Sequence, residues 1–188
     1  NAYATSGLTG VDWIVGDRVV VGPGEEPLFS ERVATLDQCY LTFAVQHPAP
    51  PVARPPCQDR RGLTFGCLAP LYKVNREVLE LWAEVLRRAA GARLLLAGRA
   101  LASRSNRAAV LAALAARGVE EDRVELHGPA DHLDFLRLYD RVDVALDTFP
   151  YSGGTTTMEA LWQGVPVLTA RGDRWALSLP FVGKLLRA

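Results

Sequence analysis

A glycine- and threonine-rich turn is the part of this sequence whose residue types are best suited to bind a ligand. It follows a short, mostly apolar run over residues 142–146, which is typical of a buried strand. It precedes apolar side chains at helical spacing over residues 158–162, and Gly164 and Pro166 then mark the end of that helix. The residues of the turn are Gly153, Gly154, Thr155, Thr156 and Thr157.

The chemistry that this turn predicts is the binding of an anion. A helix that begins directly after a glycine-rich turn leaves its first backbone N–H groups without partners. The helix dipole adds partial positive charge at the same place, and phosphate is the anion most often bound there. The alternative is a threonine that caps the helix, with glycines that only let the chain turn. Physical reasoning alone leaves these two interpretations evenly matched.

Three ordered blocks of the chain resemble one known family. They are YATSGLTGVDWIVGD (residues 3–17), LTFGCLAPLYKVNREVLELWAEVLRR (63–88) and LDTFPYSGGTTTMEALWQGVPVLT (146–169). Together they are similar to the SPINDLY and O-linked N-acetylglucosamine transferase family, and the resemblance extends from about Tyr3 to Trp175. Members are nucleotide-sugar-dependent protein glycosyltransferases of the GT-B fold, with two Rossmann-like lobes and an active site between them. The resemblance favours the phosphate interpretation of the turn.

The resemblance implies a role for each of several side chains. Lys73 matches a family lysine beside the donor diphosphate, where a cation stabilises the charge that grows on the leaving oxygens. Thr155, Thr156 and Thr157 match positions that contact the diphosphate. Glu159 matches a position near the ribose, whose two hydroxyls suit a carboxylate. Without the resemblance, Lys73 would be a solvated lysine and Glu159 a first-turn acid favoured by the helix dipole.

The nucleotide base has two implied contacts, and the chain departs from the family near both. Ala130 and His132 match family positions around the base, although a lone histidine is more often a surface or cap residue. Better-studied relatives have a histidine where this chain has Phe135. The family usually has Asn or Gln three residues before the lysine, where this chain has Pro70, so donor positioning is expected to differ. His47 lies among prolines and is given no role.

No metal site or cofactor is expected. The sequence has no D-x-D, the usual carboxylate pair that holds Mg²⁺ or Mn²⁺ against a diphosphate in metal-dependent transferases. A helix N-terminus and Lys73 would take over that task. The motifs G-x-S-x-G, G-K-[ST] and H-E-x-x-H are absent as well. No residue is assigned as general base.

These residues are positioned by a repeated strand–helix pattern. Strands are predicted over residues 63–68, 94–97, 124–126, 142–146 and 166–169. Four helices are predicted between them. The first has an apolar face from Val74 to Leu86 and ends at Gly91, and the second is alanine-rich, is capped by Ser103 or Ser105 and ends before Gly118. The third is short and runs from an Asp131 cap to Tyr139, and the fourth begins at Thr155. The pattern predicts an α/β fold, a Rossmann-like parallel sheet with helices on both faces, whose ligands bind beyond the carboxyl ends of the strands.

Three regions are predicted along the chain. Residues 1–45 resemble the tail of the N-terminal catalytic lobe, with strands over 11–15, 19–21 and 41–45. Residues 46–61 form a proline-rich linker, because proline cannot supply helix or ladder hydrogen bonds. Residues 62–188 form the nucleotide-sugar donor-binding lobe, truncated at its C-terminus. The tetratricopeptide repeats common upstream in the family are absent, and the start at Asn1 indicates a fragment that we expect to be inactive alone.

Composition excludes several classes of function. The 188 residues are 49% hydrophobic, enough for a real core, and 21 basic residues balance 21 acidic ones. We therefore expect no nucleic-acid partner and no membrane partner. No stretch approaches the roughly 20 apolar residues that span a bilayer. Cys39, Cys57 and Cys67 lack metal-ligand spacing and are typical of reduced thiols in a cytoplasmic protein.

The function implied by the resemblance is that of an inverting, metal-independent protein O-glycosyltransferase. It would transfer a sugar, with UDP-N-acetylglucosamine favoured as the donor, to Ser or Thr hydroxyls of proteins. The SPINDLY branch uses GDP-fucose, and these motifs do not separate a UDP-sugar from a GDP-sugar. Two alternatives stay open: a nucleotide-sugar-binding fragment without catalysis, and another GT-B enzyme such as a small-molecule transferase or an epimerase.

Overall fold

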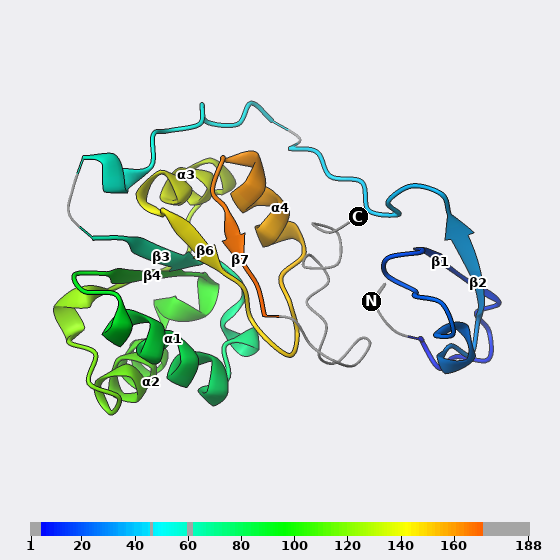
Figure 1. Cartoon of the computed structure of the whole chain (residues 1–188), viewed down its shortest axis with the longest axis horizontal. Helices are drawn as coiled ribbons and strands as arrows, with labels where there is room; N and C mark the ends of the chain where they lie inside the picture. The colour runs from blue at the N-terminus through cyan, green and yellow to red at the C-terminus, as the bar shows by residue number, and fades with distance from the viewer. Residues whose placement is uncertain (1–4, 46, 60–61, 171–188) are drawn as a thin grey trace.

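The computed structural model describes residues 5–45, 47–59 and 62–170. Tyr3 and Trp175, which bound the family resemblance, lie outside the described residues. Figure 1 shows a small two-stranded unit and a larger α/β unit, joined by an extended segment. The larger unit contains the glycine- and threonine-rich turn.

The two-stranded unit pairs β1 (Trp13–Asp17) with β2 (Arg32–Leu36) in parallel. The predicted strand over 19–21 was wrong, because the chain turns there. The Asp17 carboxylate accepts hydrogen bonds from the backbone N–H groups of Val19 (2.9 Å) and Val20 (2.8 Å). This local side-chain bonding competes with strand pairing and outweighs the β-propensity of three valines.

The larger unit is a parallel sheet with the strand order β5–β4–β3–β6–β7. The strands are β3 (Thr64–Cys67), β4 (Arg93–Ala97), β5 (Val124–His127), β6 (Val144–Leu146) and β7 (Val167–Leu168). The chain starts in the centre at β3, builds one side through β4 and β5, and then returns to add β6 on the other side. This reversal creates a switch point between β3 and β6, where ligands of such folds bind. The predicted α/β class is confirmed.

Helices cover both faces of this sheet, as Figure 1 shows. α1 (Arg76–Arg88) and α2 (Arg104–Ala115) pack on the face that includes Leu94 and Leu96. α3 (His132–Arg137) and α4 (Thr155–Trp162) pack on the face that includes Leu95 and Ala97. Alternate residues of β4 thus serve two cores, the pattern of a strand buried on both sides. Among the described residues, no helix is both long and apolar enough to cross a membrane.

The predicted helix caps are confirmed where the structure describes them. The Ser103 side chain accepts a hydrogen bond from the backbone N–H of Asn106, and Asp131 accepts one from Asp134. The chain leaves α1 through Gly91, whose φ of +72° favours glycine. α3 is shorter than predicted and continues as a 3-10 turn, Leu138–Arg141, a common way for a helix to end.

The segment between the two units packs on the larger unit. Residues 41–45 form no strand, so that prediction was wrong. The Phe43 ring meets the Trp162 ring of α4 edge-on, with centroids 5.9 Å apart. Val45 and Ala49 pack against the core beneath α3 and α4, and Val52 lies against Gly164. We call residues 43–45 and 47–52 the crossover segment. The predicted domain boundaries stay predictions.

Candidate functional site

Lys73 and the glycine- and threonine-rich turn meet at the switch point of the sheet. Lys73 ends a 3-10 turn, Leu71–Lys73, just after β3, and the glycine- and threonine-rich turn follows the neighbouring strand β6. The Lys73 ammonium donates a hydrogen bond of 2.8 Å to the carbonyl oxygen of Ser152. It also lies 4.2 Å from the centroid of the Tyr151 ring, in cation–π contact. The structure therefore brings together two predicted parts of the site that lie far apart in the sequence.

The Lys73 ammonium is partly desolvated. Burial lowers its pKa, and the negative charge of Asp147 acts in the opposite direction. A charge that is partly withdrawn from water interacts more strongly with another charge than an exposed one does. Lys73 is thus suited to act on an anion bound at the turn, and the interpretation as a fully solvated lysine does not describe it.

Asp147 fixes the shape of the turn from beneath. Its Oδ1 accepts hydrogen bonds from the backbone N–H groups of Thr148 (2.9 Å) and Gly153 (2.6 Å). Its Oδ2 accepts one from the Thr169 hydroxyl (2.8 Å). Burial raises the pKa of this carboxyl, although these bonds oppose the shift. This role of Asp147 was not predicted from the sequence. The signal that could have indicated it is an aspartate shortly before a glycine-rich turn, a position from which its side chain commonly bonds turn N–H groups.

Two further side chains hold the backbone of the turn. The Asn75 amide donates to the carbonyl oxygen of Phe149 (3.0 Å), while its own oxygen caps α1 through the N–H of Val78. The Tyr139 hydroxyl donates to the carbonyl oxygen of Thr156 (2.6 Å). Sequence reasoning missed both, because each bond joins elements that are far apart along the chain. The turn is therefore anchored by the residue that caps α1 and by a tyrosine of the 3-10 turn after α3.

The start of α4 matches the anion-binding interpretation better than the capping one. Gly154, not a threonine, holds the N-cap position, and glycine has no side chain that could accept bonds from the first N–H groups. Gly153 lies so close to the Thr157 hydroxyl that a Cβ would collide with it. Thr157 is buried there, whereas Thr155 is exposed and Thr156 half-buried. The accessible groups at this helix start are those of Thr155 and Thr156.

The residues predicted around the nucleoside lie at the same edge of the sheet. Glu159 is buried in α4, and its Oε1 lies 2.8 Å from Nε2 of His132 at the start of α3. Ala130 is exposed in the loop between β5 and α3. His47, to which the sequence analysis gave no role, lies with its Nε2 2.8 Å from Nδ1 of His132. No pattern in the sequence indicated this contact, because the two histidines are 85 residues apart.

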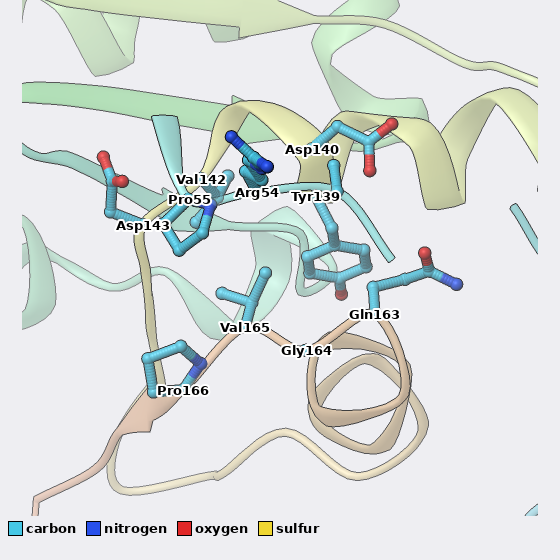
Figure 2. Close-up of a pocket in the computed structure, with 11 residues that line it drawn as sticks. Arg54, Pro55, Tyr139, Asp140, Val142, Asp143, Gln163, Gly164, Val165 and Pro166 are labelled. Carbon is cyan, nitrogen blue, oxygen red and sulfur yellow. The ribbon is translucent and has the colours of Figure 1, made fainter. Parts of the chain in front are cut away.

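A second pocket lies at the opposite, amino-terminal edge of the sheet, where Figure 2 shows it between the segment before β6 and the end of α4. Its volume is about 20 Å³, room for about one water molecule. Gln163 is only 3% exposed, and neither polar atom of its amide has a partner in the described part of the chain. Another pocket of the same volume, about 20 Å³, borders the turn and is lined in part by Asp147, Thr156 and Thr157. Volume therefore does not distinguish the two pockets, and the one in Figure 2 is set apart by its place away from the turn.

Comparison with known proteins assigns the chain to a family. The family described as Glycosyl transferase family 41 matches residues 60–179. A probable UDP-N-acetylglucosamine–peptide N-acetylglucosaminyltransferase SPINDLY of Eustoma exaltatum is 34% identical over 170 residues, 89% of this chain. The corresponding probable transferase SEC of Arabidopsis thaliana is 30% identical over 180 residues, 92% of this chain.

A solved structure gives the same result in three dimensions. A mutant of the O-GlcNAc transferase of Thermobaculum terrenum superposes with a TM-score of 0.85 and 37% identity, over 98% of this chain and 34% of that chain. The present chain spans 18% of the length of the SPINDLY and SEC relatives named above. The suspected family resemblance and the relation to the GT-B fold are confirmed by these matches.

Proposed function

Since this chain belongs to glycosyl transferase family 41, we propose that it holds the nucleotide-sugar donor of a protein O-glycosyltransferase. The donor is UDP-N-acetylglucosamine, and the acceptors are Ser or Thr hydroxyls of proteins. The observation that carries this proposal is the convergence of Lys73 and the uncapped start of α4 at the switch point of the sheet. The names of the relatives, UDP-N-acetylglucosamine–peptide transferases, support the choice of donor and acceptor.

The proposed mechanism uses the turn as an anion cradle that needs no metal. The diphosphate binds the free N–H groups at the start of α4 and the hydroxyls of Thr155 and Thr156. Lys73 exchanges its bond to the Ser152 carbonyl for one to a phosphate oxygen. The acceptor oxygen forms a bond to the anomeric carbon as the bond to the diphosphate breaks on the opposite face, and the hydroxyl proton passes to water. Negative charge grows on the leaving oxygens, so Lys73 stabilises the transition state more than the ground state.

The nucleoside end of the donor extends toward α3. Glu159 accepts hydrogen bonds from the ribose hydroxyls, and Ala130 and His132 border the base. Glu159 is assigned this role because it lies in α4, the helix whose first N–H groups meet the diphosphate, and because its Oε1 contacts His132 at the start of α3. A donor bound in this way would cross the carboxyl edge of the sheet from the turn to the start of α3.

A thermal-shift screen in the presence of a chelator tests the proposal. UDP-N-acetylglucosamine and UDP should raise the melting temperature of the chain, because a ligand that binds only the folded state stabilises it by mass action. Lys73→Ala should reduce the shift with UDP, which carries the charge that develops on the leaving group, more than the shift with UDP-N-acetylglucosamine. Arg87→Ala, which removes an exposed cation at the far end of α1, should change neither. A shift with GDP-fucose alone would overturn the choice of donor. No shift with any nucleotide would overturn the proposal.

A further inference from the structure

A line of polar contacts joins the crossover segment to the proposed nucleoside site. Glu159 Oε1 lies 2.8 Å from His132 Nε2, and His132 Nδ1 lies 2.8 Å from His47 Nε2. The two imidazole rings meet edge to face, with centroids 4.8 Å apart. His47 and His132 are 85 residues apart in sequence, so this contact exists only because of the path of the crossover segment.

The positions of these contacts give His47 a specific task. Each ring nitrogen of His132 meets one partner, Glu159 at Nε2 and His47 at Nδ1, so the ring cannot turn without losing a contact. The Nδ1 of His47 lies 3.1 Å from the carbonyl oxygen of Pro48, which holds the His47 ring in turn. A partner on one ring nitrogen sets the tautomer and the orientation of the other, as outer-shell partners do for metal-bound histidines. His47 therefore orients His132, and His132 orients Glu159.

His47 is itself held in place by the packing of the crossover segment. Before it, Phe43 contacts Trp162 of α4, and Val45 packs against the core under α3 and α4. After it, Ala49 packs against the same core. The proline-rich sequence around His47 reduces the freedom of the backbone further. A side chain restrained from both directions is preorganised and can orient its neighbour at little entropic cost.

We infer that His47 is a positioning residue for the nucleoside end of the donor, acting through His132 on Glu159. This inference rests on the proposed function. It adds that the crossover segment, and not only the donor lobe, determines affinity for the nucleotide. The diphosphate end is held by different groups, Lys73 and the start of α4, so loss of His47 should affect the two ends of the donor unequally.

Calorimetry on the 188-residue chain, with UDP and inorganic pyrophosphate as probes, tests the inference. His47→Ala should weaken UDP binding about three- to tenfold, the worth of one lost hydrogen bond. His47→Gln keeps an amide that can donate or accept a hydrogen bond and should restore most of the affinity, and pyrophosphate binding should not change in either variant. The matched control is His127→Ala, which removes another histidine–glutamate pair, with Glu125, from the outer strand β5.

The possible failures are distinguishable. If the wild-type chain binds no UDP, the proposed function and this inference fall together. If it binds UDP and His47→Ala binds equally well, only the inference falls. Equal weakening of UDP and pyrophosphate, or a Gln variant as weak as the Ala variant, would show a general structural role. Nitrogen-15 spectra of the imidazoles provide an independent readout: the Nδ1 signal of His132 should report a hydrogen bond in the wild type that is absent in His47→Ala.

Discussion

Replacement of Asp147 separates the two things that this side chain does. It accepts hydrogen bonds from the buried N–H groups of Thr148 and Gly153 and from the Thr169 hydroxyl, and it keeps a carboxylate out of water. Asp147→Ala removes both the bonds and the charge. Asp147→Asn removes the charge, keeps Oδ1 as the acceptor for both N–H groups, and turns an amide N–H₂ toward Thr169, whose hydroxyl can then accept.

The magnitudes follow from these contacts. A buried donor left without a partner costs about 1–3 kcal/mol, so two backbone N–H groups set a scale of about 2–6 kcal/mol for Asp147→Ala. Removal of a carboxylate that is unfavourably buried offsets part of this, and we expect a net loss of about 2–4 kcal/mol in unfolding free energy. Asp147→Asn should remain within about 1 kcal/mol of the wild type.

The pH dependence has a definite sign. Burial raises the folded-state pKa of Asp147 above its usual value. Such a group contributes stability that is fully present below the unfolded-state pKa and is lost as pH rises through the folded-state pKa. The Asn variant has no such loss. Its unfolding free energy relative to the wild type should therefore increase from pH 4 to pH 7.

Urea unfolding followed by the fluorescence of the buried Trp82 measures these differences. Asp122→Ala, at an exposed acid in the turn before β5, is the control and should lie within about 0.5 kcal/mol of the wild type. Equal stability of the Ala and Asn variants at Asp147 would refute the reasoning, because it would mean that the N–H groups of the turn do not depend on this acceptor.

Three further predictions concern other groups. In the complete transferase, Lys73→Ala should lower turnover about 10²–10³-fold with little change in the Michaelis constant; a raised constant with unchanged turnover would contradict the leaving-group role. Burial raises the pKa of Asp140, so Asp140→Asn should raise the melting temperature at pH 7 and lose this advantage near pH 3; an equal effect at both pH values would contradict the cause. Burial raises the pKa of Cys67 to about 12, so a thiol reagent at pH 8 should label the exposed Cys39 and Cys57 in the native chain and also Cys67 after unfolding; labelling of all three at the native rate would contradict the burial of Cys67.

The strands of the larger unit were predictable because a parallel sheet covered on both faces needs nearly continuous apolar runs. The strand predicted over 94–97 corresponds to β4 (Arg93–Ala97), which begins one residue earlier. The apolar residues over 19–21 and 41–45 misled the analysis for different reasons. In the first, the Asp17 side chain bonds the backbone into a turn. In the second, apolar side chains pack on α4 from a segment without regular structure.

The place of the candidate site in the fold was also predictable, but the side-chain contacts that hold it in shape were not. A glycine-rich turn after a strand of a parallel sheet lies at the carboxyl edge, and Lys73 follows a strand of the same sheet, so their proximity follows from topology. The bond from Asn75 to Phe149 and the contact between His47 and His132 join residues 74 and 85 positions apart. Such contacts depend on the path of the whole chain, and no local pattern specifies them.

The central claim is that the turn binds a diphosphate without metal, and calorimetry with UDP and uridine tests it most directly. UDP should bind far more tightly than uridine, and a chelator should change neither affinity. Thr156→Val should weaken UDP binding about tenfold or more, the worth of a hydrogen bond to a charged group, while the melting temperature of the free chain stays the same. Equal binding of uridine and UDP, or UDP binding abolished by the chelator, would contradict the account.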